Sequence, residues 1–309
     1  MKRILKTTLI ILIVASYSCK KQEKHFISDE IYRAQVVEQF EKQKKKANNR
    51  ANKLFAVLNS DISLEKKEAL QFLFAYMPLS DLADYDGEFF LQNVEVALMT
   101  KDTFSWGKTI PENIFRHFVL PYRINNENLD TARIVFFNEL KERIKHLSMK
   151  EAALEVNHWC HEKVSYKGSD MRTSAPLSTV CTSWGRCGEE STFTVTAMRA
   201  AGIPARQCYT PRWAHCDDNH AWVEVWVDNN LYQTGINFID NKIAISWDEP
   251  LVIDKDGVNI KLLAFADDLQ NKAKLQGHLL TDKDFVDQDD IFSSNIIWSS
   301  DNIYYNSYL

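Results

Sequence analysis

The chain has 309 residues, of which 45% are apolar and 26% are charged, and its formal net charge at pH 7 is −5. This composition is that of a globular protein with a sizeable core, in one large domain or two smaller ones. The acidic balance argues against a nucleic-acid-binding protein, which would show a basic surplus. No glycine-rich phosphate loop is present either.

The first residues have the pattern of a bacterial lipoprotein signal peptide over residues 1–18. A basic start precedes an apolar run at residues 9–15, which is shorter than the about 20 residues of a transmembrane helix. Small residues then lead to Cys19, after which the chain turns polar. We expect cleavage before Cys19 and lipidation of this cysteine, which would anchor the protein in the cell envelope, at the outer membrane or cell surface. Ser16 stands where such signals usually have leucine, so plain secretion is the alternative.

A polar tether over residues 19–27 and a mainly helical domain over residues 28–146 are expected next. Apolar residues recur at helical spacing in several segments of this region, and the first of them is rich in Lys, Glu and Gln. Ser63, followed by an acidic first turn, marks the start of another helix. The region up to residue 146 has no motif that carries chemistry. We therefore predict a helical domain that packs against the rest of the chain.

Cys187 is the strongest candidate for chemistry. It lies in the Trp-Gly-Arg-Cys-Gly-Glu run of residues 184–189, directly ahead of the apolar helical run 192–201. A helix start offers unpaired N–H groups and the positive end of the helix dipole, which favour a thiolate. Gly185 and Gly188 would allow a sharp turn and a close approach of the backbone to a ligand. The alternative is a cysteine that only packs in the core.

His220 is the partner that a thiol nucleophile needs. It opens the alternating strand 220–227, and a return strand is expected at residues 231–238 after a turn. An imidazole can take the thiol proton and return it to a leaving group. We predict that Trp184 and Trp213 wall the cleft around this pair, although both could be core residues.

Three runs resemble the core of the transglutaminase-like superfamily, a papain-like branch of thiol enzymes. They are Gly-Arg-Cys-Gly-Glu at residues 185–189, Arg-Ala-Ala-Gly-Ile-Pro-Ala-Arg at 199–206 and His-Ala-Trp-Val-Glu-Val at 220–225. The runs 120–127 and 209–220 are similar to bacterial surface proteins of this superfamily from the Bacteroidetes.

The resemblance implies an α+β fold with a papain-like transglutaminase core over residues 147–240, in which a helix packs on an antiparallel sheet. A helical domain would precede this core, and residues 241–309 would form a C-terminal extension without a recognised motif. By the same resemblance Cys187 is the nucleophile and His220 the general base.

The third residue of the expected triad is missing from its usual position. In the superfamily it is an aspartate about sixteen residues after the histidine, where this chain has Gly-Ile at residues 235–236. If the strands turn on Asn-Asn at residues 229–230, Asn237 shares the face of His220, whereas a three-residue turn would bring Asp240 there. Two-residue loops with asparagine are favoured, so we predict that Asn237 orients His220.

The remaining cysteines are Cys160, Cys181, Cys208 and Cys216, and their three possible disulfide pairings stay open. The spacing of His and Cys residues matches no common zinc site, so we expect no metal and no cofactor.

These observations favour a surface-anchored thiol enzyme that acts on an amide bond in a protein or peptide substrate. It would form a thioester at Cys187 and catalyse peptidase- or amidase-like hydrolysis. The alternative, motivated by the missing aspartate, is a catalytically impaired fold that binds peptide or glycan.

Overall fold

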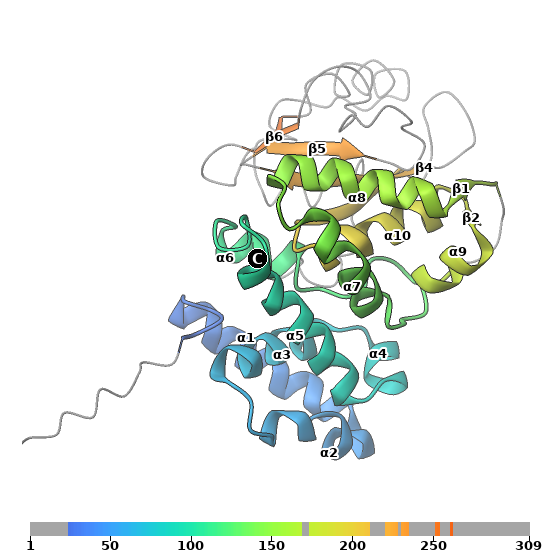
Figure 1. The fold of residues 1–309 in the computed structure, drawn as a ribbon. Helices are drawn as coiled ribbons and strands as arrows, with labels where there is room; N and C mark the ends of the chain where they lie inside the picture. The colour runs from blue at the N-terminus through green and yellow to red at the C-terminus, as the bar shows by residue number, and fades with distance from the viewer. Residues whose placement is uncertain are drawn as a thin grey trace, which may run out of the picture.

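A computed structural model describes residues 24–168, 173–210, 220–227, 230–234, 251–253 and 260–261. Figure 1 shows helices α1 to α5 gathered in one half of the molecule, and α7 to α10 with the strands in the other. The elements of the first half are α1 (Glu30–Lys46), α2 (Ala51–Leu54), α3 (Leu64–Tyr76), α4 (Leu79–Asp84), α5 (Gly87–Thr103) and α6 (Glu112–Phe118), with short 3₁₀ turns at Asn48–Arg50 and Ala56–Asn59.

The first half confirms the expected helices and shows which of their faces are buried. In α1 the buried residues are Val36, Phe40 and Gln43, and the helix packs along α3 while its charged face meets solvent. The side chain of Ser63 accepts from the N–H of Lys66 and caps α3. Among the helices of the described residues, none is long and apolar enough to cross a membrane.

The chain enters the fold earlier than the predicted tether over residues 19–27 implies. Phe26 and Ile27 are only 2% and 1% exposed. Their backbone N–H groups donate to the buried carboxylate of Glu68, at 2.7 and 3.3 Å. This apolar Phe-Ile pair can be buried although its segment is polar, because the carboxylate of Glu68 satisfies both of its backbone N–H groups.

The second half contains the helix that carries the cysteine. Its elements are α7 (Ala132–Ile144), α8 (Met149–Lys163), β1 (Ser165–Tyr166), α9 (Pro176–Thr182), β2 (Trp184–Gly185), α10 (Cys187–Ala200), β3 (Ala205–Thr210), β4 (His220–Val227), β5 (Asn230–Thr234), β6 (Leu251–Ile253) and β7 (Ile260–Lys261). The strands β3 to β7 form one antiparallel sheet in chain order, and β1 pairs with β2 in parallel.

Helix α10 is the centre of this half, with β3 and β4 on one side and α7, α8 and α9 around it (Figure 1). Every residue from Glu189 to Ala200 is buried. The rings of Phe136, Trp159 and Phe193, from α7, α8 and α10, lie 5.1 to 5.6 Å apart between centroids. The fold is therefore α+β, with a helix packed on an antiparallel sheet and a helical region before it, as the sequence predicts.

The hairpin between β4 and β5 turns one residue earlier than the one assumed from the sequence, with a loop of the same length. Val227 pairs with Asn230, so the connection consists of residues 228–229 and not of 229–230. Asp and Asn both suit a two-residue loop, and Asn230 instead joins the ladder. Because the register moves by two residues on one strand, the same residues of β4 and β5 still share a face of the sheet.

The two halves share one core, because buried apolar side chains from Phe26 to Val227 form a continuous cluster. Helix α5 contacts both α7 and α10, and the indole N–H of Trp106 donates to the carbonyl of Ala201 at 3.3 Å. The division into domains at residues 146 and 147 stays a prediction.

Candidate active site

Cys187 is the first residue of α10, at the end of a tight connection from α9. Ser183 closes α9 in the left-handed conformation, with φ of 60°, and β2 follows at once. The N–H of Arg186 donates to the carboxylate of Glu189 at 3.1 Å, which is one half of a capping box. The backbone of the cysteine turn is thus fixed by a non-glycine turn residue and by a helix cap.

The two glycines beside the cysteine differ in how closely they are packed. Among the described glycines only Gly202 has a positive φ, so neither Gly185 nor Gly188 turns the backbone through the left-handed conformation, and the close approach to a ligand stays a prediction. A Cβ added to Gly185 would lie 2.7 Å from the Cβ of Glu189. Gly185 is therefore required by packing, whereas a Cβ on Gly188 would meet its nearest neighbour, the hydroxyl of Thr173, at 3.6 Å.

His220 begins the strand that passes beside the cysteine. Its backbone pairs with Thr210 at the end of the β3–β4 ladder. The backbone of the next residue, Ala221, hydrogen-bonds to the thiol of Cys187, as does that of Gly188. The start of β4 and the start of α10 are therefore in contact, which brings together the two positions that the sequence singles out.

The described surroundings of Cys187 favour the neutral thiol. Burial is the largest influence and raises the pKa of Cys187 above its usual range. The backbone hydrogen bonds from Ala221 and Gly188 and the charge of Arg186 lower this pKa, and the nearby carboxylate of Glu189 raises it further. A reaction at this sulfur consequently needs a base that takes its proton.

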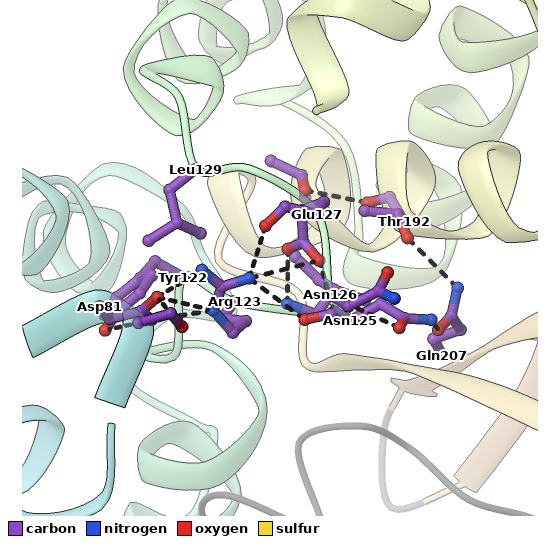
Figure 2. Close-up of polar contacts among 12 residues, drawn as sticks. Asp81, Tyr122, Arg123, Asn125, Asn126, Glu127, Leu129, Thr192 and Gln207 are labelled. Carbon is purple, nitrogen blue, oxygen red and sulfur yellow. Dashed lines mark hydrogen bonds and ion pairs between the residues drawn. The ribbon is translucent and has the colours of Figure 1, made fainter. Parts of the chain in front are cut away.

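A buried amide supports the start of α10 from the sheet. Gln207, in β3, is 1% exposed and its Nε2 donates to the hydroxyl of Ser191 at 2.7 Å. The hydroxyl of Ser191 in turn donates to the carbonyl of Cys187. The Oε1 of Gln207 accepts from the side chain of Asn125 at 2.6 Å, and Figure 2 shows this contact between the 120–127 run and the sheet.

The 120–127 run is held by buried ion pairs. The guanidinium of Arg123 forms a forked contact with Asp81 of α4, with Nε 2.8 Å from Oδ2, and donates to the carbonyl of Glu127 at 2.6 Å (Figure 2). Burial raises the pKa of Glu127, although N–H groups of Ile124 and Asn125 and the charge of Arg123 favour its ionised form. Arg199, 0% exposed, donates to the carbonyls of residues 121, 123 and 205 and ties α10 to the same run.

The other predicted site residues are only partly described. Trp184 is half-buried in β2, and the Nζ of Lys167 lies 4.7 Å from the centroid of its ring. Trp184 thus lies next to the cysteine turn, and its role as a wall of the cleft stays a prediction. Trp213, Asn237, Asp240, Cys216 and Cys19 lie outside the described residues.

Each described cysteine is a free thiol. Cys160 and Cys208 are buried, Cys181 is exposed and Cys187 lies between these extremes. Within the part of the chain that the structure describes, no three His, Cys, Asp or Glu side chains are grouped to hold a metal ion. A described cavity of about 20 Å³, lined by residues including Tyr122, Asp130 and Pro176, has room for about one water molecule and is not at Cys187.

Sequence reasoning missed Gln207, Ser191 and Asn125. Gln207 and Asn125 are 82 residues apart in the chain, and each is an ordinary polar residue in its own segment. The available signal was the resemblance of the 120–127 run to surface proteins of the superfamily, since this run turns out to contact the helix of the cysteine.

Comparison with known proteins gives a family match for one region of the chain. Residues 138–234 match the transglutaminase-like superfamily. A solved structure from Cytophaga hutchinsonii, described as "a Putative Cysteine Protease", is 18% identical with a TM-score of 0.29. The similar region covers 35% of this chain and 37% of that protein, so the chain spans well under two thirds of its length. Among curated proteins, none matches this sequence.

Proposed function

We propose that the transglutaminase-like domain of this chain, at residues 138–234, acts as a thiol hydrolase on an amide bond in a protein or peptide. Cys187 is the nucleophile and His220 the general acid and base. The observation that carries the proposal is the hydrogen bond between the backbone of Ala221 and the thiol of Cys187. His220 directly precedes Ala221 in the chain, so this bond supports a place for His220 close to the sulfur.

In the proposed reaction His220 takes the thiol proton as the sulfur attacks the carbonyl carbon of the amide. The C–S bond forms, and the carbonyl oxygen becomes an oxyanion that N–H groups at the start of α10 stabilise. The C–N bond then breaks, and His220 gives its proton to the leaving amine. Water, deprotonated by His220, attacks the thioester and releases the acid and the free thiol.

Asn237 is the proposed partner of the far nitrogen of His220. The β4–β5 ladder pairs Val223 with Thr234 and Val227 with Asn230. Continued for three more residues, the same register would pair position 220 with position 237. Asp240 would then fall on the other parity, so the register supports Asn237 over Asp240. Trp184, and by the sequence Trp213, would contact the substrate.

Surface anchoring is part of the proposal. The signal pattern of residues 1–18 supports a lipid on Cys19, and Phe26, seven residues later, is buried in the fold. Since seven residues at about 3.5 Å each reach at most about 25 Å, the domain would lie close to the membrane.

The test compares two cysteines of the same folded protein. Iodoacetamide is added at neutral pH, and the labelling of each cysteine is followed by peptide mass spectrometry. Cys181 is the more exposed thiol, so accessibility alone would label it first. The proposal predicts faster labelling of Cys187, and that peptide cleavage by the protein is lost in Cys187→Ala. Slower labelling of Cys187 than of Cys181 would contradict it.

A second function is favoured by one specific observation. Burial raises the pKa of Cys187, and the described residues around it do not reverse that direction. A domain whose thiol stays neutral would be a catalytically impaired fold that binds peptide or glycan at the cell surface. In that case peptide or glycan binding would be unchanged in Cys187→Ala, and no acyl group would be found on Cys187 after incubation with peptides.

A further inference from the structure

The amide of Gln207 has every polar atom engaged at the start of the cysteine helix. Its Oε1 accepts from Asn125, and its Nε2 lies 2.7 Å from the hydroxyl of Ser191, 3.1 Å from the carbonyl of Gly188 and 3.2 Å from the hydroxyl of Thr192. Because Gln207 is buried, none of these partners can be replaced freely by water. The orientation of the amide is therefore fixed, with its N–H side toward α10.

These contacts form a directed chain of hydrogen bonds that ends at the nucleophile. Asn125 donates to Gln207, Gln207 to Ser191, and Ser191 to the carbonyl of Cys187. That carbonyl belongs to the same peptide group as the N–H of Gly188, which bonds to the sulfur of Cys187. Donation to a peptide oxygen polarises the peptide and strengthens its N–H as a donor.

The first residue of this series of hydrogen bonds, Asn125, is held by the helical half of the molecule. The backbone N–H of Asn125 donates to the buried carboxylate of Glu127 at 2.7 Å. Arg123 binds the carbonyl of Glu127 and the carboxylate of Asp81, so the loop that carries Asn125 is tied to α4 (Figure 2). The side chain of Asn125 thus has a fixed backbone from which to reach the sheet.

We propose that Gln207 and Asn125 are positioning residues for Cys187. They orient the hydroxyl of Ser191 onto the Cys187 carbonyl and thereby hold the Gly188 N–H on the sulfur. The helical half would then contribute to the site by holding the 120–127 run that carries Asn125. This inference rests on the proposed function, because it concerns a thiol that reacts.

The variant Gln207→Met tests this role, with Gln43→Met as its matched control. Gln43 is also a buried glutamine, 6% exposed, and its Nε2 donates to the carbonyl of Met77 at 3.0 Å, in α1 and away from α10. The rate of iodoacetamide labelling at Cys187 is measured from about pH 6 to about pH 10, a range that spans the usual thiol pKa. The loss of one hydrogen bond should raise the labelling pKa by about half a unit to one unit, which slows labelling at neutral pH about 3- to 10-fold.

Gln43→Met should label like the wild type, even where its unfolding midpoint is lower. Ser191→Ala removes the hydroxyl that links Gln207 to the carbonyl of Cys187, at a helix position where alanine is well tolerated. This variant provides the test if Gln207→Met does not fold. Its labelling pKa should rise in the same direction. The double variant should label no more slowly than the slower single variant, because both substitutions break one chain.

Two results would overturn the inference: a Gln207→Met profile that equals that of Gln43→Met, or effects of Gln207→Met and Ser191→Ala that simply add. Either result leaves the proposed function standing if His220→Ala still changes the labelling pKa of Cys187. A labelling pKa that His220→Ala leaves unchanged would instead count against the proposed function itself.

Discussion

Arg206 and Glu224 face each other directly across β3 and β4, with Nη2 and Oε2 2.6 Å apart. Both are buried, at 5% and 0% exposed, and the Nε of Arg206 donates to the same oxygen at 2.7 Å. Their neighbour Cys208 is also buried, and burial together with the charge of Glu224 raises the pKa of its thiol. Since β4 begins at His220, this ion pair fixes the register of the strand that carries the proposed base.

The variant Glu224→Gln should destabilise the protein strongly. It leaves the guanidinium of Arg206 buried without a compensating charge, which costs about 3–5 kcal/mol. Urea unfolding measures this loss as a lower midpoint. Glu38→Gln is the control, because Glu38 forms an exposed ion pair with Lys42 and should leave the midpoint unchanged. Equal midpoints for the two variants would mean that the buried pair does not hold the sheet.

The variant Gly202→Ala should also be destabilising, by at least about 2 kcal/mol. Gly202 follows α10 with φ of +68°, and a Cβ there would lie 2.6 Å from the side chain of Thr100 in α5. The end of the cysteine helix therefore packs tightly against the helical half. Gly168→Ala, whose Cβ would meet only the hydroxyl of Tyr166 at 3.8 Å, should unfold at the wild-type temperature. A wild-type melting temperature for Gly202→Ala would refute this packing.

The protein should lose stability in alkali because two thiols are buried. Burial raises the pKa of Cys160 and of Cys208 in the folded chain. Above the unfolded-state pKa near 8.5, the unfolded chain therefore binds fewer protons than the native one, and the free energy of unfolding falls as pH rises.

Cys160→Ala should reduce that fall by up to about 1.4 kcal/mol per pH unit above about pH 9. Unfolding in urea at about pH 8 and about pH 10 measures the slope on both sides of the thiol range. Cys181→Ala, which removes an exposed thiol, should keep the wild-type slope. The same slope in Cys160→Ala as in the wild type would show that this thiol does not contribute.

We predict that the proposed membrane anchoring depends on Cys19. Expression of the full chain in a bacterium that processes lipoproteins should give a protein that incorporates labelled fatty acid and sediments with membranes. Cys19→Ala should incorporate none and should leave the mature domain out of the membrane fraction. Retention of the label in Cys19→Ala would mean that the lipid, if any, is attached elsewhere.

The sequence predicts the parts of the site that local patterns encode. The start of α10 at Cys187 and the strand from His220 follow from a helix signal and from alternation, and both are confirmed. The hairpin position differs by one pair, because Asp and Asn are equally acceptable in a two-residue loop. The sequence does not show that a Cβ on Gly185 would lie too close to Glu189, because this contact depends on the packing of the turn against α10.

What the sequence does not predict is the set of buried polar side chains. Gln207, Glu127 and Arg199 are at most 1% exposed, yet nothing in their own segments distinguishes them from solvated polar residues. Gln207 and Arg199 are buried because partners distant in the chain satisfy their hydrogen bonds, whereas Glu127 accepts from the N–H groups of its neighbours Ile124 and Asn125. Such pairing depends on the packing of the two halves, which periodicity and composition do not contain.

The pH dependence of iodoacetamide labelling at Cys187, in the wild type and in His220→Ala, tests the central claim most directly. In His220→Ala only the described surroundings act on the thiol, so burial should hold the labelling pKa above the free-thiol value of about 8.5. In the wild type the imidazolium of the proposed pair would favour the thiolate and lower that pKa by about 1–3 units. A labelling pKa that is the same in both proteins would contradict the proposed pair of Cys187 and His220.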